Sequence, residues 1–249
     1  GVEASRGRLD AARSYNEERR ALAATADRPG SVFSSEVALA QLDVAAGLDS
    51  LAAVRRLERR FREIFADVPE PNRPYGDMAG LWAFLGDDVN QARIWSDQAV
   101  ATFPPEAVGS PFYEELQLLI EAFLALPAEV YQTTLTNLRE VIRRQNNCDD
   151  CYLENLADAH EGLAQPDSAI VYLERFLAVQ LFDFVRGQEE QTADRLQQLE
   201  RLYEEVGRTE DAAKTWTRFA DRWADADPVL QPQVKAARAN AERLSSGGN

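Results

Sequence analysis

The residues best suited to chemistry are two cysteines, Cys148 and Cys151, which form a C-x-x-C motif where a helix is expected to begin. A helix N-terminus lowers the pKa of a thiol, so a redox role has a physical basis. Thioredoxin-like proteins, however, place such a motif in a strand–helix–strand context, and this sequence predicts none. Zinc needs four ligands, and the sequence adds only one histidine, His160, to the two cysteines. The motif therefore predicts either a local disulfide or two packed thiols, and a disulfide would suit an oxidising compartment.

The single histidine, His160, is the second candidate for chemistry. No nucleophile stands at a recognisable spacing from it, and Tyr203 fills the same position in a second copy of the local pattern. His160 is therefore expected to be a core aromatic residue with one polar tip. The sequence also contains no glycine-rich phosphate loop, nucleophile elbow or run of metal ligands. We expect no enzymatic activity, no cofactor and no metal.

The pattern around His160 repeats after 43 residues. In each copy, apolar residues at i, i+3 and i+7 precede a small-residue break and a second apolar run, which is typical of two amphipathic helices forming a hairpin. Helix-breaking residues fall at the breaks, with Pro166 in one copy and Gly207 in the other. The chain is therefore predicted to be an all-α helical repeat protein. The matched positions are Leu153, Leu156, His160, Ala164, Ala169, Leu173 and Phe176 with Leu196, Leu199, Tyr203, Gly207, Ala212, Trp216 and Phe219.

The second copy resembles the tetratricopeptide repeat (TPR) family, in the order Leu, Tyr, Gly, Ala, large aromatic, apolar. Its period exceeds the family's usual length of about 34 residues, which indicates lengthened helices or loops. The resemblance implies a right-handed α-solenoid of antiparallel helical hairpins that binds other proteins, and it names no partner. The phrases PDSAI-x-x-L and ADADP also resemble the TPR tails of bacterial signalling proteins, although no kinase motif is present. The residues that carry the family pattern are Leu199, Tyr203, Gly207, Ala212, Trp216 and Phe219.

We expect about twelve helices, forming a single TPR-like array over residues 1–249. The clearest repeats cover 150–180 and 192–225, and a helix over 228–244 is expected to cap the C-terminal end. A weaker copy of the repeat lies upstream, over 79–104. The tryptophans recur with the hairpin breaks and are expected in the core, at Trp82, Trp95, Trp216 and Trp223.

The N-terminal residues 3–25 have the pattern of a second hairpin helix with no first helix before it. This helix can fold back on its own chain, derive from a preceding repeat, or dock on another copy around residues 223–244. Docking on another copy would be a heterologous contact, which closes into a ring or grows into a filament. The apolar residues that lack the usual hairpin partner are Leu9, Ala12, Leu22 and Ala23.

The formal net charge of −15 argues against nucleic acid or an anionic membrane as a partner. No apolar run approaches the roughly 20 residues needed to span a bilayer, so no membrane insertion is expected. The chain begins at Gly1 rather than Met, so either a leader has been removed or the sequence is a piece of a longer protein. The compartment stays open, with an extracytoplasmic or secreted location slightly favoured. A basic run is expected to form a solvated helix face, with Arg55, Arg56, Arg59, Arg60 and Arg62.

In TPR-like arrays the first helix of each hairpin lines the surface that contacts ligands. The resemblance therefore implies a protein-binding wall, which is mainly acidic and favours a basic protein or peptide. The Lys, Arg and Asn set with which chaperone-binding members hold a C-terminal carboxylate is not apparent. The expected function is a non-enzymatic interaction scaffold; the alternatives are a structural subunit that self-associates head-to-tail through its N-terminal helix, or the C-terminal sensory or docking domain of a larger bacterial signalling protein. The wall residues are Glu154, Asp158, Glu161, Gln197, Arg201 and Glu204.

Overall fold

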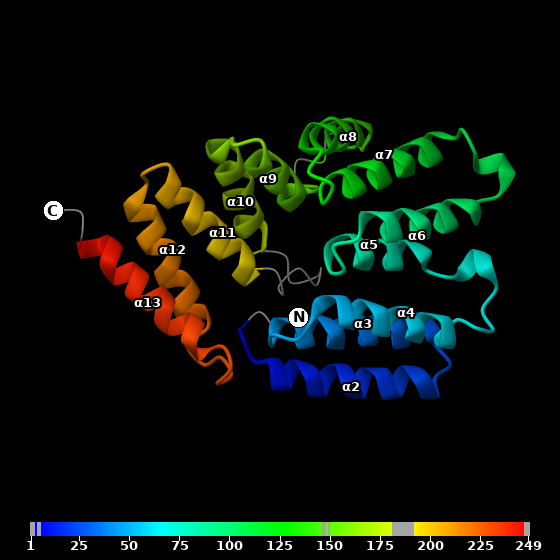
Figure 1. Cartoon of the computed structure of the whole chain (residues 1–249), viewed down its shortest axis with the longest axis horizontal. Coiled ribbons are helices and arrows are strands. Elements are labelled where there is room, and N and C mark those ends of the chain that lie inside the picture. Colours follow the sequence, from blue (N-terminus) through cyan, green and yellow to red (C-terminus); the bar gives the residue numbers. More distant parts are fainter. Residues whose placement is uncertain (1–2, 4–5, 146–147, 149, 181–191, 247–249) are drawn as a thin grey trace. The chain divides into compact units, whose positions relative to one another are not determined.

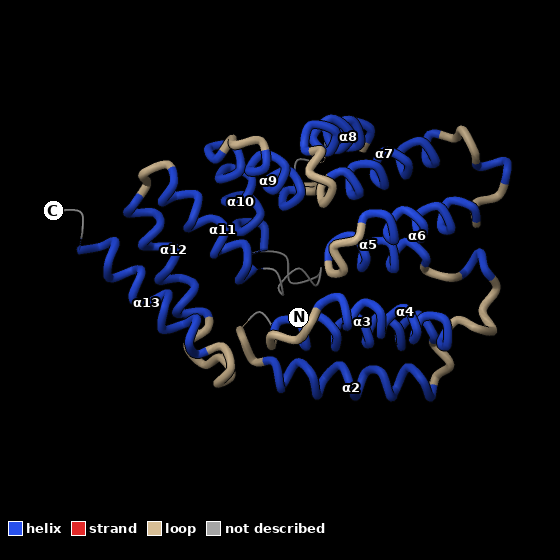
Figure 2. Tube along the Cα trace, viewed as in Figure 1, coloured by secondary structure: helices blue, strands red, loops and turns tan. Residues whose placement is uncertain are grey.

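The computed structural model describes residues 3, 6–145, 148, 150–180 and 192–246. Within these residues the regular structure consists of twelve α-helices and two short 3-10 helices, with no strand (Figures 1 and 2). This confirms the all-α prediction. The chain, treated as one array in the sequence analysis, is organised as two compact units: Arg13–Cys148, and Gly1–Ala12 together with Asp149–Asn249.

The unit Arg13–Cys148 consists of helices joined by short loops. Two of its helices begin at aspartates, because the Asp49 and Asp88 side chains accept hydrogen bonds from backbone N–H groups in the first turn. The segments rich in proline between the helices form loops that include the two 3-10 helices. The α-helices are α2 (Leu9–Thr25, whose first turn belongs to the other unit), α3 (Pro29–Ala45), α4 (Ser50–Ile64), α5 (Tyr75–Phe84), α6 (Val89–Ala101), α7 (Pro111–Ala125) and α8 (Tyr131–Arg144).

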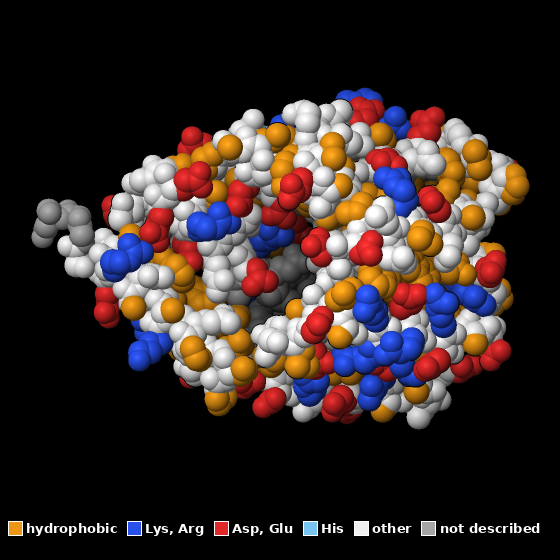
Figure 3. All heavy atoms as spheres, in the orientation of Figure 1, with side chains coloured by type: hydrophobic (Ala, Val, Ile, Leu, Met, Phe, Trp, Pro, Cys, Tyr) orange, Lys and Arg blue, Asp and Glu red, His pale blue; other side chains and the backbone are white. Residues whose placement is uncertain are grey.

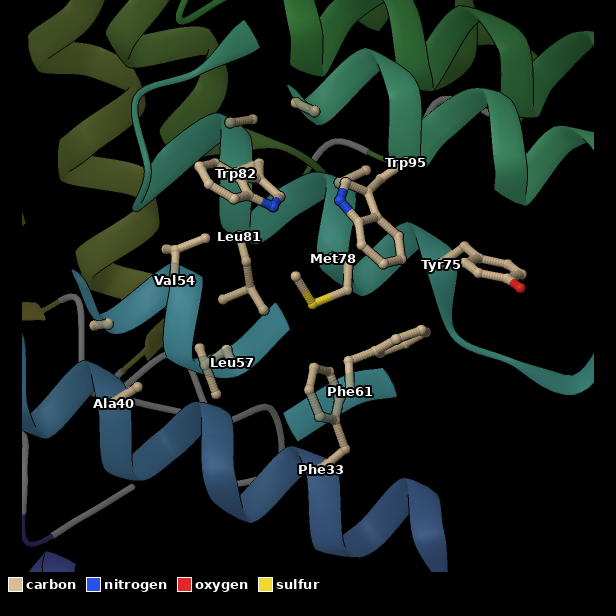
Figure 4. Close-up of a cluster of buried hydrophobic side chains, with 14 of the residues drawn as sticks. Phe33, Ala40, Val54, Leu57, Phe61, Tyr75, Met78, Leu81, Trp82 and Trp95 are labelled. Carbon is tan, nitrogen blue, oxygen red and sulfur yellow. The ribbon is translucent and has the colours of Figure 1, made fainter. Parts of the chain in front are cut away.

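The core of this unit is an aromatic cluster shared by α3, α4, α5 and α6 (Figure 4). Phe61 packs edge-to-face on Phe33, with ring centroids 5.3 Å apart, and on Trp95 at 5.2 Å. Met78 and Trp82 complete the cluster and are buried. Trp82 and Trp95 therefore lie in the core, as the sequence predicted.

Arginine side chains gather over α2, α3 and α4 (Figure 3). Arg13 and Arg56 each donate a hydrogen bond of 2.6 Å to the carboxylate of Asp43 on α3. Burial alone would raise the pKa of Asp43, but these hydrogen bonds outweigh it and hold the pKa below its ordinary value. Arg20 and Arg60 flank Glu36 of α3 in the same way. Two members of the basic run therefore pair with α3 rather than only facing water.

The second unit contains the two clear repeats. The helices of each repeat pack against one another, α9 on α10 and α11 on α12, and α13 packs on α12. The breaks match as well, because Ala164 and Gly207 both adopt left-handed backbone, with φ of 54° and 75°. Both members of five matched pairs are buried, and Leu173 with Trp216 is the pair that differs. The helices are α9 (Leu153–Gly162), α10 (Pro166–Gln180), α11 (Thr192–Glu205), α12 (Thr209–Arg222) and α13 (Gln231–Ser246).

The C-terminal helix begins at Gln231 rather than at Pro228, because Asp227 to Leu230 form a turn. This turn holds the N-terminal segment of the same chain. The backbone N–H of Asp227 donates to the carbonyl of Gly7 at 2.9 Å, and its carboxylate accepts from the N–H of Asp10 at 2.8 Å. Asp227 thus supplies a hydrogen bond to the first turn of α2 from far along the chain.

Gly7 is required at this contact. Its φ of +72° is left-handed, and a Cβ there would lie 2.5 Å from the Cβ of Ala226. Leu9 and Ala12 follow it and are buried, whereas Leu22 is 63% exposed. The sequence left three arrangements open for the N-terminal helix. The structure has the first of them, because the N-terminal residues pack on the C-terminal hairpin of their own chain.

Candidate functional site

The predicted wall residues lie on α9 and α11. Glu154, Asp158 and Glu161 are half-buried on α9, and Arg201 and Glu204 are exposed on α11. The structure brings the two helices together through side chains: Arg201 donates to Glu161 at 2.6 Å. Gln197, the sixth predicted residue, is half-buried on α11.

Two residues that the sequence analysis missed, Arg195 and Gln198, complete this contact. Arg195 forms an ion pair with Asp158, with one nitrogen 3.0 Å from its Oδ2. The amide of Gln198 donates to Asp158 at 2.8 Å and to Glu161 at 2.7 Å. The acidic side chains of α9 are therefore balanced by arginines of α11, and a basic ligand would have to compete with them. Burial raises the pKa of the remaining acid, Glu154.

An ion pair of the same kind recurs one repeat later. Arg243 of α13 donates to both oxygens of Glu204, at 3.2 and 3.1 Å. Glu204 occupies the position in α11 that Glu161 occupies in α9, 43 residues earlier. The wall is thus a series of cross-helix ion pairs rather than a row of unpaired carboxylates.

A pocket of about 400 Å³ opens beside this wall. Its α11 side comes from one helix face, because positions 197, 200, 201 and 204 follow the i, i+3, i+4, i+7 spacing. Three of these are predicted wall residues, and Glu200 is an addition. Trp216 of α12 forms the other side.

Glu200 is the unusual residue of this pocket. It is only 3% exposed, and its buried Oε2 has no hydrogen-bond partner. Burial, together with repulsion from Glu204, raises the pKa of Glu200 to about 9, although Arg201 offsets part of the effect. The carboxyl group is therefore neutral at pH 7. The sequence did contain a signal: Glu200 lies four residues after Leu196 on the apolar face, where the earlier copy has Ala157.

Trp216 corrects the expectation that all four tryptophans belong to the core. It is partly exposed, and its indole N–H donates to Glu204 across 3.4 Å. The matched residue in the first copy, Leu173, is fully buried. The tryptophan therefore leaves an aromatic surface beside Glu200.

The two candidates for chemistry lie elsewhere. His160 is buried, stacks on Tyr172 with ring centroids 5.3 Å apart, and shares a hydrogen bond of 2.7 Å between its Nδ1 and Gln165. These contacts agree with a core aromatic residue. Cys148 and Cys151 are both disulfide-bonded, so neither carries a thiol for redox or metal chemistry in this state. Among the described residues, no group of three or more His, Cys, Asp or Glu side chains could hold a metal ion.

No family model matches the chain, and neither does any curated protein. The TPR resemblance therefore remains a prediction carried by the chain's own residues. No described helix has the length and apolar character needed to cross a membrane.

Proposed function

We propose that the chain is a non-enzymatic protein–protein interaction scaffold, built as a TPR-like right-handed α-solenoid of antiparallel helical hairpins. The observation that carries this proposal is the pocket formed by α11 and Trp216. Tryptophan and arginine around a water-poor centre are the composition of interaction hot spots. This pocket has that composition, because Trp216 and the exposed Arg201 surround the buried Glu200.

The cross-helix network supports binding by a preformed surface. Arg195 and Gln198 hold α11 to Asp158 of α9, so little side-chain freedom would be lost when a partner binds. Preformed surfaces gain affinity because the ordering cost is smaller. Stacked repeats present such surfaces over a length suited to an extended peptide.

The N-terminal contact favours this function over head-to-tail assembly. The surface around Ala226 and Leu230 already packs on Gly7 of the same chain. A second copy could use this surface only by displacing that segment. In the self-associating alternative, the N-terminal helix of a second copy would therefore compete with the chain's own N-terminal segment for this surface.

A peptide-display selection against the full chain would test the proposed function. We expect selected peptides to bind the full chain and to lose at least tenfold in affinity on the double substitution Arg201→Ala and Trp216→Ala. Glu205→Ala is the matched control, because Glu205 lies on the same helix and is exposed. A selection that enriches no binder, or binders indifferent to the double substitution, would contradict the proposal.

A further inference from the structure

We propose that the pocket between α11 and α12 receives the ammonium group of a lysine side chain from the bound partner, with Glu200 as its anionic acceptor. This inference rests on the proposed function and specifies the chemistry of its partner. The pocket is lined by Gln197, Glu200, Arg201, Glu204 and Trp216.

Oε2 of Glu200 is buried and accepts no hydrogen bond, which is costly for a polar atom. Because Oε2 is closed to solvent, the Glu200 side chain has to turn this oxygen toward the pocket, where an ammonium group supplies the missing donor. The carboxyl proton of Glu200 passes to solvent, and the resulting carboxylate and the ammonium form a pair with no net charge.

The other charged side chains of the pocket already have partners. Arg201 is paired with Glu161, and Arg243 of α13 is paired with Glu204. Of the two carboxyl groups that line the pocket, Glu200 is therefore the one that has no arginine paired with it when it ionises. A ligand with a single positive charge would therefore give every carboxylate of the pocket a cation.

Trp216 is partly exposed and contributes an indole surface. Tryptophan is the side chain that best attracts a cation to its face, and the same surface packs on methylene groups. A lysine side chain has both parts, a charged tip and an aliphatic stem.

Lysine and arginine differ in the geometry of their charged groups. A guanidinium group is planar and matches two carboxylate oxygens side by side, whereas an ammonium is a compact charge that needs no such pair. Glu200 presents one unsatisfied buried oxygen. The pocket therefore favours the ammonium.

The test uses the full chain at pH 8.5, where the lysine side chain keeps its charge and a measurable share of Glu200 is ionised. The probes are Nα-acetyl-lysine-N-methylamide and the corresponding norleucine and arginine compounds. The readout is the indole N–H signal of Trp216 in an NMR titration, assigned with Trp216→Phe. We expect a saturable shift with the lysine probe, at least tenfold weaker binding of the arginine probe, and no saturable shift with norleucine.

Two substitutions sharpen the result. Glu200→Gln should weaken the lysine probe at least tenfold, whereas Glu205→Gln on the exposed side of α11 should leave it unchanged. Calorimetry with the Trp216→Leu variant should show an independent loss of affinity for the lysine probe. Trp216 is partly exposed, so this substitution is suited to the test. Equal binding of norleucine, or undiminished lysine binding to the Glu200→Gln variant, would overturn the inference.

The outcomes also separate this inference from the proposed function. Peptides that bind the full chain through the pocket but are indifferent to Glu200→Gln would refute the lysine site and keep the scaffold. A lysine probe that binds while display enriches no peptide would keep the amine site and refute the scaffold.

Discussion

Replacing the buried carboxyl group of Glu200 with an amide should make the stability of this protein less sensitive to pH. Glu200→Gln preserves the shape of the side chain and removes its ionisation. In the wild-type chain, burial and the nearby Glu204 disfavour the charged form, so folding holds the proton on Glu200. The variant has no such proton to lose.

The magnitude follows from the pKa of Glu200, which rises from 4.5 to about 9 on folding. Because the folded state binds the proton more tightly, the stabilisation is complete below pH 4.5 and is lost as the pH rises towards 9. Between these values, the loss is about 1.4 kcal/mol for each pH unit. The wild type should therefore lose about 4 kcal/mol relative to the Glu200→Gln variant between pH 5 and pH 8.

Urea unfolding of both proteins at pH 5, 6, 7 and 8 measures this difference, because other titrating groups cancel in the comparison. Glu205→Gln serves as the control, since Glu205 is exposed on the same helix and its substitution should leave the pH dependence unchanged. If the difference between wild type and Glu200→Gln stays constant over this range, Glu200 is not a buried neutral acid and the argument for the pocket fails.

The remaining predictions concern the two ends of the second unit and its repeat core. Gly7→Ala should destabilise the protein by more than Gly207→Ala. Both glycines have left-handed φ, so each substitution has a backbone cost of about 1–2 kcal/mol, but only at Gly7 does the new Cβ meet Ala226. Amide exchange at Asp10 and Asp227 should rise in the Gly7→Ala variant only, and equal effects of the two substitutions would contradict the N-terminal contact. Ala212→Leu should cost about 1–3 kcal/mol by overpacking the fully buried contact between hairpin helices. Trp216→Ala should cost less than the about 3–5 kcal/mol of a buried tryptophan, because Trp216 is partly exposed. Thermal unfolding checks both, and an Ala212→Leu variant as stable as the wild type would show that the repeat alignment is misplaced. Light scattering of the full chain should give a monomer at micromolar concentration, since the chain's own N-terminal segment covers part of the C-terminal hairpin; polymers would restore the head-to-tail alternative.

The helical repeat could be predicted because its determinants are local. Spacing of apolar residues, proline at helix starts and glycine at helix ends act within one or two turns. Burial therefore agrees with the alignment at matched positions such as Leu156 with Leu199 and Ala169 with Ala212. Even the break without a glycine, at Ala164, adopts the left-handed backbone of Gly207.

The contacts between distant helices could not be predicted in this way. The pairing of Arg195 with Asp158 depends on the register of α11 against α9, which no local pattern specifies. The contact of Gly7 with Asp227 joins residues from opposite ends of the sequence. The sequence identified the acidic residues of the wall and Arg201, but it did not identify Arg195 and Arg243 as the cations that pair with Asp158 and Glu204.

The two copies of the repeat differ in chemical character at two aligned positions. Ala157 and Leu173 of the first copy are fully buried apolar residues, and their counterparts in the second copy are Glu200 and Trp216. A repeat that served only to stack helices would keep both positions apolar, since a buried carboxyl group lowers stability. Both departures instead line the same pocket. Local violations of packing rules are expected at functional sites, because only function offsets their cost in stability. The coincidence of two such violations therefore favours a binding role at this pocket over an accident of packing.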